Sequence, residues 1–121
     1  LETPEEQAAL LYEFTPITQQ LEALRETLDD TSKVEDMATQ LNQAYLEQDL
    51  EKMMSLSDQE QTDPAFMQAM LGLRNHKWME RIPGIMDAQP ALIVVGALHL
   101  AGPDGLISLL RNAGYSVTPL D

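Results

Sequence analysis

His99 is the residue of this 121-residue chain whose type and position most clearly suggest chemistry, and it ends the stretch Gly96-Ala97-Leu98-His99. The apolar run 91–95 directly precedes this G-x-x-H stretch and has the β-branched character of a strand covered on both faces. Ligands of open α/β sheets gather at the carboxyl ends of strands, where loops and helix N-termini line a crevice. A histidine there can serve as a metal ligand or a general base, or can simply hydrogen-bond at a strand end.

Two further polar residues, Arg74 and Asn75, lie on a predicted helix that opens at Pro64. Arg74 falls on the apolar stripe of that helix, and burying an unpaired guanidinium is costly. It therefore needs a partner, which is either a structural acid such as Glu2 or Asp104, a chain terminus, or the carboxylate of a substrate. Asn75 has the same two interpretations, structural and functional.

Other catalytic signatures are missing from the sequence. It has no H-E-x-x-H, no G-x-S-x-G, no phosphate-binding glycine loop and no dinucleotide fingerprint, so we expect no nucleotide cofactor. The absence of cysteine excludes disulfides and thiolate chemistry. With only two histidines, a zinc site of three protein ligands would have to recruit carboxylates. His76 lies off the apolar stripe, and we expect it in solvent.

The charge of the chain is strongly negative and uneven. The formal net charge is -13, and residues 1–63 contain 16 acidic and 3 basic residues, whereas residues 64–121 contain 4 of each. Because nucleic-acid affinity comes largely from cationic side chains that displace counterions, this balance argues against nucleic acids or anionic membranes as partners. We expect the acids between Glu5 and Glu60 to form a solvated surface. No apolar run approaches the roughly 20 residues of a membrane span.

Capping signals and apolar spacing predict a mainly helical first part. The first predicted helix runs from Pro4 to about Glu13 and is capped by Thr3. Thr15-Pro16 opens a second helix with the half-buried stripe Ile17, Leu21, Leu24 and Leu28, which residues 30–32 break. A third helix has the stripe Val34, Met37, Leu41 and Tyr45, and it is followed by a short helix capped by Asp49 that runs through Met54 and by a loop over residues 57–62.

The second part is predicted to combine a long helix with strands. Asp63-Pro64 opens the helix, whose stripe is Met67, Leu71, Trp78 and Ile82, and Pro83-Gly84 ends or kinks it. A strand over 91–95, a helix around 106–110 and a strand over 115–118 then form a βαβ unit. The predicted class is therefore α/β (α+β), in one domain over residues 1–121, with an acidic helical region over 1–63 and the G-x-x-H unit within 64–121.

Several motifs together resemble the C-terminal half of the TraB/GumN family, to which the Tiki proteases are related. They are Leu1-Glu2-Thr3, Arg74-Asn75-His76-Lys77-Trp78, Val94-Val95-Gly96-Ala97-Leu98-His99-Leu100 and Gly114-Tyr115-Ser116-Val117. The resemblance implies a metal-dependent hydrolase of peptide or ester bonds, whose site combines two G-x-x-H motifs with acidic residues. Gly96 and His99 match the second G-x-x-H, Glu2 matches the acid, and Arg74 and Asn75 match the R-N pair.

These matches imply specific roles and a setting. His99 and Glu2 would bind a divalent metal (Mn, Co or Zn), and Arg74 and Asn75 would orient the substrate or support the His99 loop. The first G-x-x-H is absent, and the chain opens on Leu1 without an export signal. We therefore expect a fragment of a two-half domain that is inactive alone. The resemblance also implies a location in the periplasm or cell envelope, and we expect His99 to face Arg74 at a solvent-exposed rim. The alternative is a non-catalytic envelope protein that sequesters a peptide, with Arg74 holding its carboxylate.

Overall fold

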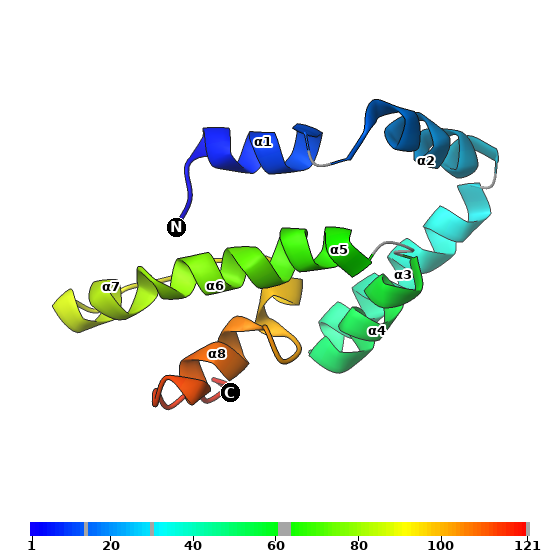
Figure 1. Cartoon of the computed structure of the whole chain (residues 1–121). Helices are drawn as coiled ribbons and strands as arrows, with labels where there is room; N and C mark the ends of the chain where they lie inside the picture. The colour runs from blue at the N-terminus through cyan, green and yellow to red at the C-terminus, as the bar shows by residue number, and fades with distance from the viewer. Residues whose placement is uncertain (14, 30, 61–63, 121) are drawn as a thin grey trace. The chain divides into compact units, whose positions relative to one another are not determined.

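The computed structural model describes residues 1–13, 15–29, 31–60 and 64–120. The chain divides into two compact units, one formed by residues 2–62 and the other by Leu1 together with residues 63–121. Figure 1 labels the helices along the chain. Arg74, Asn75 and His99 all belong to the second of these units, which therefore positions most of the candidate site.

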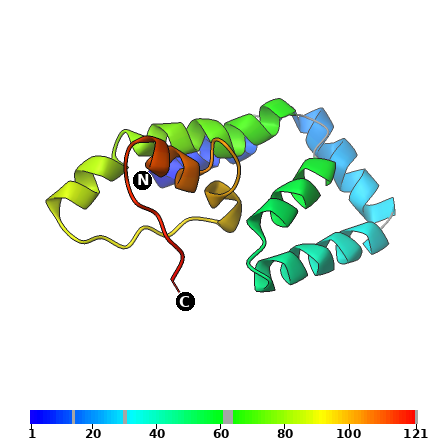
Figure 2. The ribbon, with the colours of Figure 1, turned by 90° about the horizontal axis from the view of Figure 1, so that it is seen from below.

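The predicted α/β class is wrong, because none of the described residues lies in a β-strand. Residues 91–95 are extended, and Figure 2 shows them as plain coil. Ile93 and Val95 pack against the core, whereas Leu92 is 89% exposed and Val94 is 80% exposed. The alternation of a strand is thus present, but no backbone hydrogen bond joins 91–95 to another described segment. A strand requires such a ladder.

The second predicted strand, over residues 115–118, is likewise absent from the described structure. Tyr115 N–H donates to the Leu110 carbonyl at 3.0 Å, which ties the chain to the end of the preceding helix instead of to a neighbouring strand. Gly114 makes the reversal before it with φ 93°, a left-handed conformation that glycine adopts readily. The described secondary structure of this protein is therefore helical.

The acidic unit, residues 2–62, contains four described helices: α1 (Pro4–Glu13), α2 (Ile17–Asp29), α3 (Thr31–Leu46) and α4 (Leu50–Glu60). Thr3 and Glu6 form a capping box at α1, since Glu6 N–H donates to Thr3 Oγ1 at 3.1 Å and Thr3 N–H donates to Glu6 Oε2 at 2.8 Å. Asp49 Oδ1 accepts from Lys52 N–H at 2.9 Å and caps α4. Both predicted caps are confirmed.

Other expectations for this unit need correction. Thr31 and Ser32 lie inside α3 and do not break it, and α4 continues through residues 57–60, where a loop was predicted. Asp30, Gln61 and Thr62 lie outside the described residues. The stripe of α2 is not half-buried, because its side chains are exposed: Ile17 66%, Leu21 59%, Leu24 55% and Leu28 69%. Periodicity identified the helix, but it does not guarantee that another element covers the apolar face.

In the second unit the predicted long helix is present as α5 (Pro64–Met67), a π-helical turn η1 (Gln68–Gly72) and α6 (Leu73–Met79). Helix α6 ends at Met79 and helix α7 (Ile82–Ala88) begins at Ile82. The interruption therefore precedes Pro83-Gly84, and these two residues lie within the first turn of α7. Proline in a first helical turn is well tolerated, because its missing N–H has no partner there. Asp63 lies outside the described residues.

A 3₁₀ turn, η2 (Ala97–Leu100), and helix α8 (Leu106–Asn112) complete this unit. Its core is formed by Trp78, Ile82 and Leu106, with Ile93 and Val95 packed against it. Trp78 and Ile82 belong to the predicted apolar stripe, and they bring α6 and α7 against α8. The core therefore places α6 beside the segment that carries His99.

Candidate functional site

His99 lies in η2, where it is only 8% exposed. The turn is closed by hydrogen bonds from His99 N–H to Gly96 O at 3.0 Å and from Ala101 N–H to Leu98 O at 3.3 Å. The imidazole packs on the Trp78 ring, with ring centroids 4.6 Å apart and planes tilted by 41°. The expectation of a ring presented to solvent is therefore wrong, because the 3₁₀ turn directs it toward α6.

Asn75 is the polar partner of His99, and it is 1% exposed. Its Nδ2 donates to two backbone carbonyls, those of His99 at 3.1 Å and Asp104 at 2.8 Å. Its Oδ1 lies 2.8 Å from His99 Nδ1. One buried amide thus joins α6 to the backbone at His99 and at Asp104.

These bonds determine which ring nitrogen of His99 carries a proton. Because both partners of Asn75 Nδ2 are carbonyls, which only accept, the amide cannot be turned over without losing both bonds. Oδ1 must therefore face His99 Nδ1, and Nδ1–H donates to it. In the neutral imidazole the lone pair then belongs to Nε2. This is the form of histidine that can accept a proton or coordinate a metal through Nε2.

Arg74 shares the Trp78 ring with His99. Its guanidinium carbon lies 5.0 Å from the ring centroid, and its NH1 donates to Met70 O at 3.1 Å. The side chain is half-buried, as its place on the apolar stripe predicted. A guanidinium over an indole face is held by the ring quadrupole. The structure therefore gathers Arg74, Asn75 and His99 around one aromatic residue.

The Trp78 indole itself has an unusual environment. Its Nε1–H is buried and has no hydrogen-bond partner among the described residues. Leaving a buried donor unpaired costs about 1–3 kcal/mol. The ring thus contributes packing and aromatic contacts, while its polar group gains nothing from its described surroundings.

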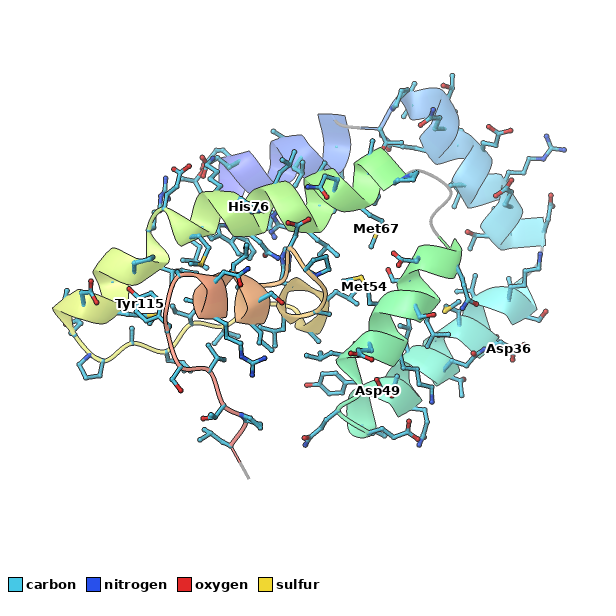
Figure 3. The ribbon with its side chains drawn as sticks, turned by 60° about the horizontal axis from the view of Figure 1, so that its bottom comes forward. Asp36, Asp49, Met54, Met67, His76 and Tyr115 are labelled. Carbon is cyan, nitrogen blue, oxygen red and sulfur yellow. The ribbon has the colours of Figure 1, made fainter. Side chains whose placement is uncertain are left out.

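The loop before α8 contains a polar contact that the sequence analysis missed. His76 Nε2 lies 2.9 Å from Asp104 Oδ1, and the two side chains are 53% and 46% exposed. Figure 3 labels His76 on its helix. The expectation of an exposed His76 is confirmed, but its side chain contacts the Asp104 carboxylate. The turn signal Gly102-Pro103-Asp104 was the only local indication that an acid would be fixed there.

Glu2 belongs to the other compact unit, two residues before the start of α1, and its predicted role as a metal ligand stays a prediction. Among the residues that the structure describes, no three His, Cys, Asp or Glu side chains are grouped so that they could hold a metal ion. His99 is chemically suited to be one ligand, but the described donors do not form a complete centre. No described helix is long and apolar enough to cross a membrane.

A comparison with protein families identifies the family of the chain. The chain matches the TraB/PrgY/gumN family over residues 1–119. This match covers nearly all of the sequence, so the chain belongs to that family. The searches of curated proteins and of solved structures gave no match.

Proposed function

We propose that this chain supplies the second G-x-x-H histidine of a metal-dependent hydrolase that acts on peptide or ester bonds. The observation that carries the proposal is the buried His99 imidazole, whose Nδ1–H is committed to Asn75 and whose neutral form presents the lone pair on Nε2. Family membership supports the proposal, because the residues concerned are those that carried the resemblance.

His99 is proposed either as a metal ligand or as a general base, because the single lone pair of Nε2 cannot serve both roles at once. As a base, Nε2 would take a proton from water while the water oxygen bonds to the carbonyl carbon of the substrate. The imidazolium would still donate Nδ1–H to Asn75 Oδ1, so its orientation would be kept through the step. The same proton would then pass to the departing amine or alkoxide as its bond to carbon breaks. Arg74 would orient the substrate carbonyl or carboxylate.

A divalent metal (Mn, Co or Zn) is part of the proposal as a cofactor. When bound, such an ion would polarise the carbonyl and lower the pKa of a coordinated water. Histidine ligands in proteins commonly donate their second ring N–H to a carbonyl or carboxylate oxygen, and His99 has this arrangement with Asn75. The described residues do not complete a centre around it. Glu2 is proposed as a second ligand, and the first G-x-x-H would have to come from outside this chain.

A non-catalytic function in peptide binding is the second candidate, and the position of Arg74 favours it. A half-buried guanidinium over Trp78 is suited to hold a carboxylate, because a bidentate charge-assisted contact is strong where water is largely displaced. In this function the protein would sequester a peptide without cleaving it. The envelope location belongs to both proposals.

Metal analysis and an activity assay on the whole protein separate the two functions. We expect Mn, Co or Zn at a stoichiometric level in the wild type, with loss of metal and of peptide or ester hydrolysis in His99→Ala. Asp87→Asn, an exposed substitution on α7, serves as the matched control and should retain both. A metal-free wild type that binds peptide, with binding abolished in Arg74→Ala, would overturn the hydrolase and support the binding protein.

A further inference from the structure

The loop that precedes α8 is fastened to α6 by two neighbouring residues. Asn75 holds it through the Asp104 backbone carbonyl at 2.8 Å, and His76 holds it through the Asp104 carboxylate at 2.9 Å. Because a carboxylate oxygen only accepts, His76 Nε2 must carry the proton that joins the two side chains. Two consecutive residues of α6, Asn75 and His76, thus hydrogen-bond to the backbone and to the side chain of Asp104.

The loop has further internal restraints that limit where Asp104 can lie. Gly105 N–H donates to Gly102 O at 3.2 Å, and Ser108 Oγ donates to the same carbonyl at 2.8 Å. Gly102 adopts φ 77°, which glycine tolerates without strain. The turn is therefore compact, and a shift of the backbone that carries the Asp104 side chain would move the Asp104 carbonyl with it.

That carbonyl matters because it is one of the two acceptors that fix the Asn75 amide. If it moves away, the amide keeps only the His99 carbonyl at 3.1 Å as an acceptor for its Nδ2. The free-energy difference between the two orientations of the Asn75 amide then becomes smaller, and the orientation that points Oδ1 at His99 Nδ1 is less strongly preferred. In the reversed orientation the amide would offer N–H to Nδ1 and stabilise the opposite tautomer.

We propose that His76 and Asp104 are positioning residues that hold the loop over 101–105 so that Asn75 keeps His99 in its Nδ1–H tautomer. The pair acts on the reactive ring only through Asn75. Its effect is limited by its exposure, because polar side-chain pairs at the surface contribute little to stability. The role gains a catalytic consequence only if the proposed function of His99 holds.

The tautomer can be measured directly on the whole chain labelled with ¹⁵N-histidine, in alkaline buffer where imidazole is neutral. The chain has two histidines, so His99 is the sole signal in variants of His76. The wild type should show a protonated Nδ1 and an unprotonated Nε2. His76→Ala and Asp104→Asn should raise the population of the Nε2–H tautomer by a factor of up to about five, the limit for an exposed pair.

Two further variants keep this test specific. His76→Gln retains a side-chain N–H for Asp104 and should restore the wild-type shifts, and Glu80→Ala, an exposed substitution beside the same helix, should leave them unchanged. Near-ultraviolet circular dichroism of the single Trp78 checks that each variant is folded. Unchanged His99 nitrogen shifts in both His76→Ala and Asp104→Asn would overturn the proposal, as would an averaged tautomer in the wild type. Because the readout needs neither metal nor substrate, failure of the hydrolase proposal would leave it intact.

Discussion

At the scale of single residues, the candidate site is organised by an amide instead of a carboxylate. Asn75 accepts from His99 Nδ1 and donates to two carbonyls, so all of its described bonds lie between α6 and the loop over 99–104. A carboxylate at this position would accept from the ring but could not donate to the carbonyls. The neutral amide therefore fixes both the loop and the tautomer without adding a charge to a buried site.

Replacing Asn75 with alanine should destabilise the second unit strongly. Two buried carbonyls would lose their donor and the His99 ring would lose its acceptor, at about 1–3 kcal/mol for each buried group left unsatisfied. Urea unfolding followed by Trp78 fluorescence measures the loss, which we expect to be at least about 2 kcal/mol. Asn112→Ala, exposed at the end of α8, is the matched control and should stay within about 0.5 kcal/mol of wild type. Equal stability of both variants would contradict this account of Asn75.

Substitutions of Trp78 separate the contribution of ring packing to stability from the contribution of the indole N–H. Trp78→Phe keeps an aromatic ring against His99 and Ile82 and removes an N–H that has no described acceptor. We expect it to cost about 1–2 kcal/mol less in unfolding free energy than Trp78→Ala, whose loss should be about 3–5 kcal/mol. Thermal unfolding followed by far-ultraviolet circular dichroism compares the two. A phenylalanine variant as unstable as the alanine variant would show that Nε1–H has an acceptor.

At the scale of elements, the turn from η2 to α8 depends on a glycine for space. A Cβ at Gly105 would overlap the backbone carbonyl oxygens of Leu100 and Ala101, whereas a Cβ at Gly84 would meet nothing within 4 Å. Gly105→Ala should therefore destabilise the unit by about 1–3 kcal/mol, because rigid backbone has to shift. Gly84→Ala, inside α7, should be neutral or stabilise by up to about 1 kcal/mol. The unfolding midpoint in urea should fall for Gly105→Ala and should stay the same or rise for Gly84→Ala. An unchanged midpoint for Gly105→Ala would refute the close approach at Gly105.

The junction of α3 and α4 contains a carboxylate with an altered titration. A hydrogen bond from Gln43 Nε2 at 2.8 Å, together with Lys52 Nζ at 3.0 Å, lowers the pKa of Glu47 from its ordinary value of 4.5. Figure 3 labels Asp49 near this junction. A lowered folded-state pKa means that the contribution to stability is present above the unfolded pKa and is lost as the pH falls through the folded one.

NMR titration of the Glu47 carboxyl should therefore give a midpoint below 4.5. Gln43→Ala and Lys52→Gln should each raise that midpoint, since each removes an interaction with the charged form. Asn42→Ala, exposed on the same helix, should leave it where it is in the wild type. A midpoint that does not respond to either Gln43→Ala or Lys52→Gln would rule out these contacts as the cause.

The elements show where sequence reasoning succeeds and where it fails. The caps of α1 and α4 were predictable, because Thr3 with Glu6 and Asp49 with Lys52 act within three residues. The fate of residues 91–95 was not predictable, because strand pairing depends on distant segments. The alternating exposure of Leu92 and Ile93 is compatible with a strand but does not show that another strand pairs with it. The incorrect α/β class came from assuming that such pairing occurs.

The candidate site was predictable in its residues but not in its contacts. The G-x-x-H motif identified His99, and the apolar stripe of the predicted long helix identified Arg74 and its neighbour Asn75. These residues drew notice because a polar side chain in such a position needs a partner. The bonds between Asn75 and His99 span 24 residues, and no spacing rule connects them. The role of His76 escaped for the same reason, because its partner Asp104 is 28 residues away.

At the scale of the whole molecule, the two compact units differ in core and in charge. In residues 2–62 the described buried hydrophobic side chains are Ala44, Met53 and Leu56, whereas the other unit buries Trp78, Ile82 and Leu106. All of the formal net negative charge also lies in residues 1–63, which contain 16 acidic and 3 basic residues. Small cores and like-charge repulsion both lower stability, and salt screens the repulsion.

We therefore expect the acidic unit to unfold first. Trp78, the only tryptophan, reports on the second unit, while far-ultraviolet circular dichroism reports on the helices of both. In urea the circular dichroism signal should begin to fall at a lower concentration than the fluorescence changes, and added salt should narrow the gap. Met53→Ala should shift the early phase alone, whereas Ile82→Ala should shift the fluorescence transition. Coincident transitions in the wild type would show instead that the chain unfolds as one cooperative unit, because a shared core would then tie the stability of the acidic helices to that of Trp78.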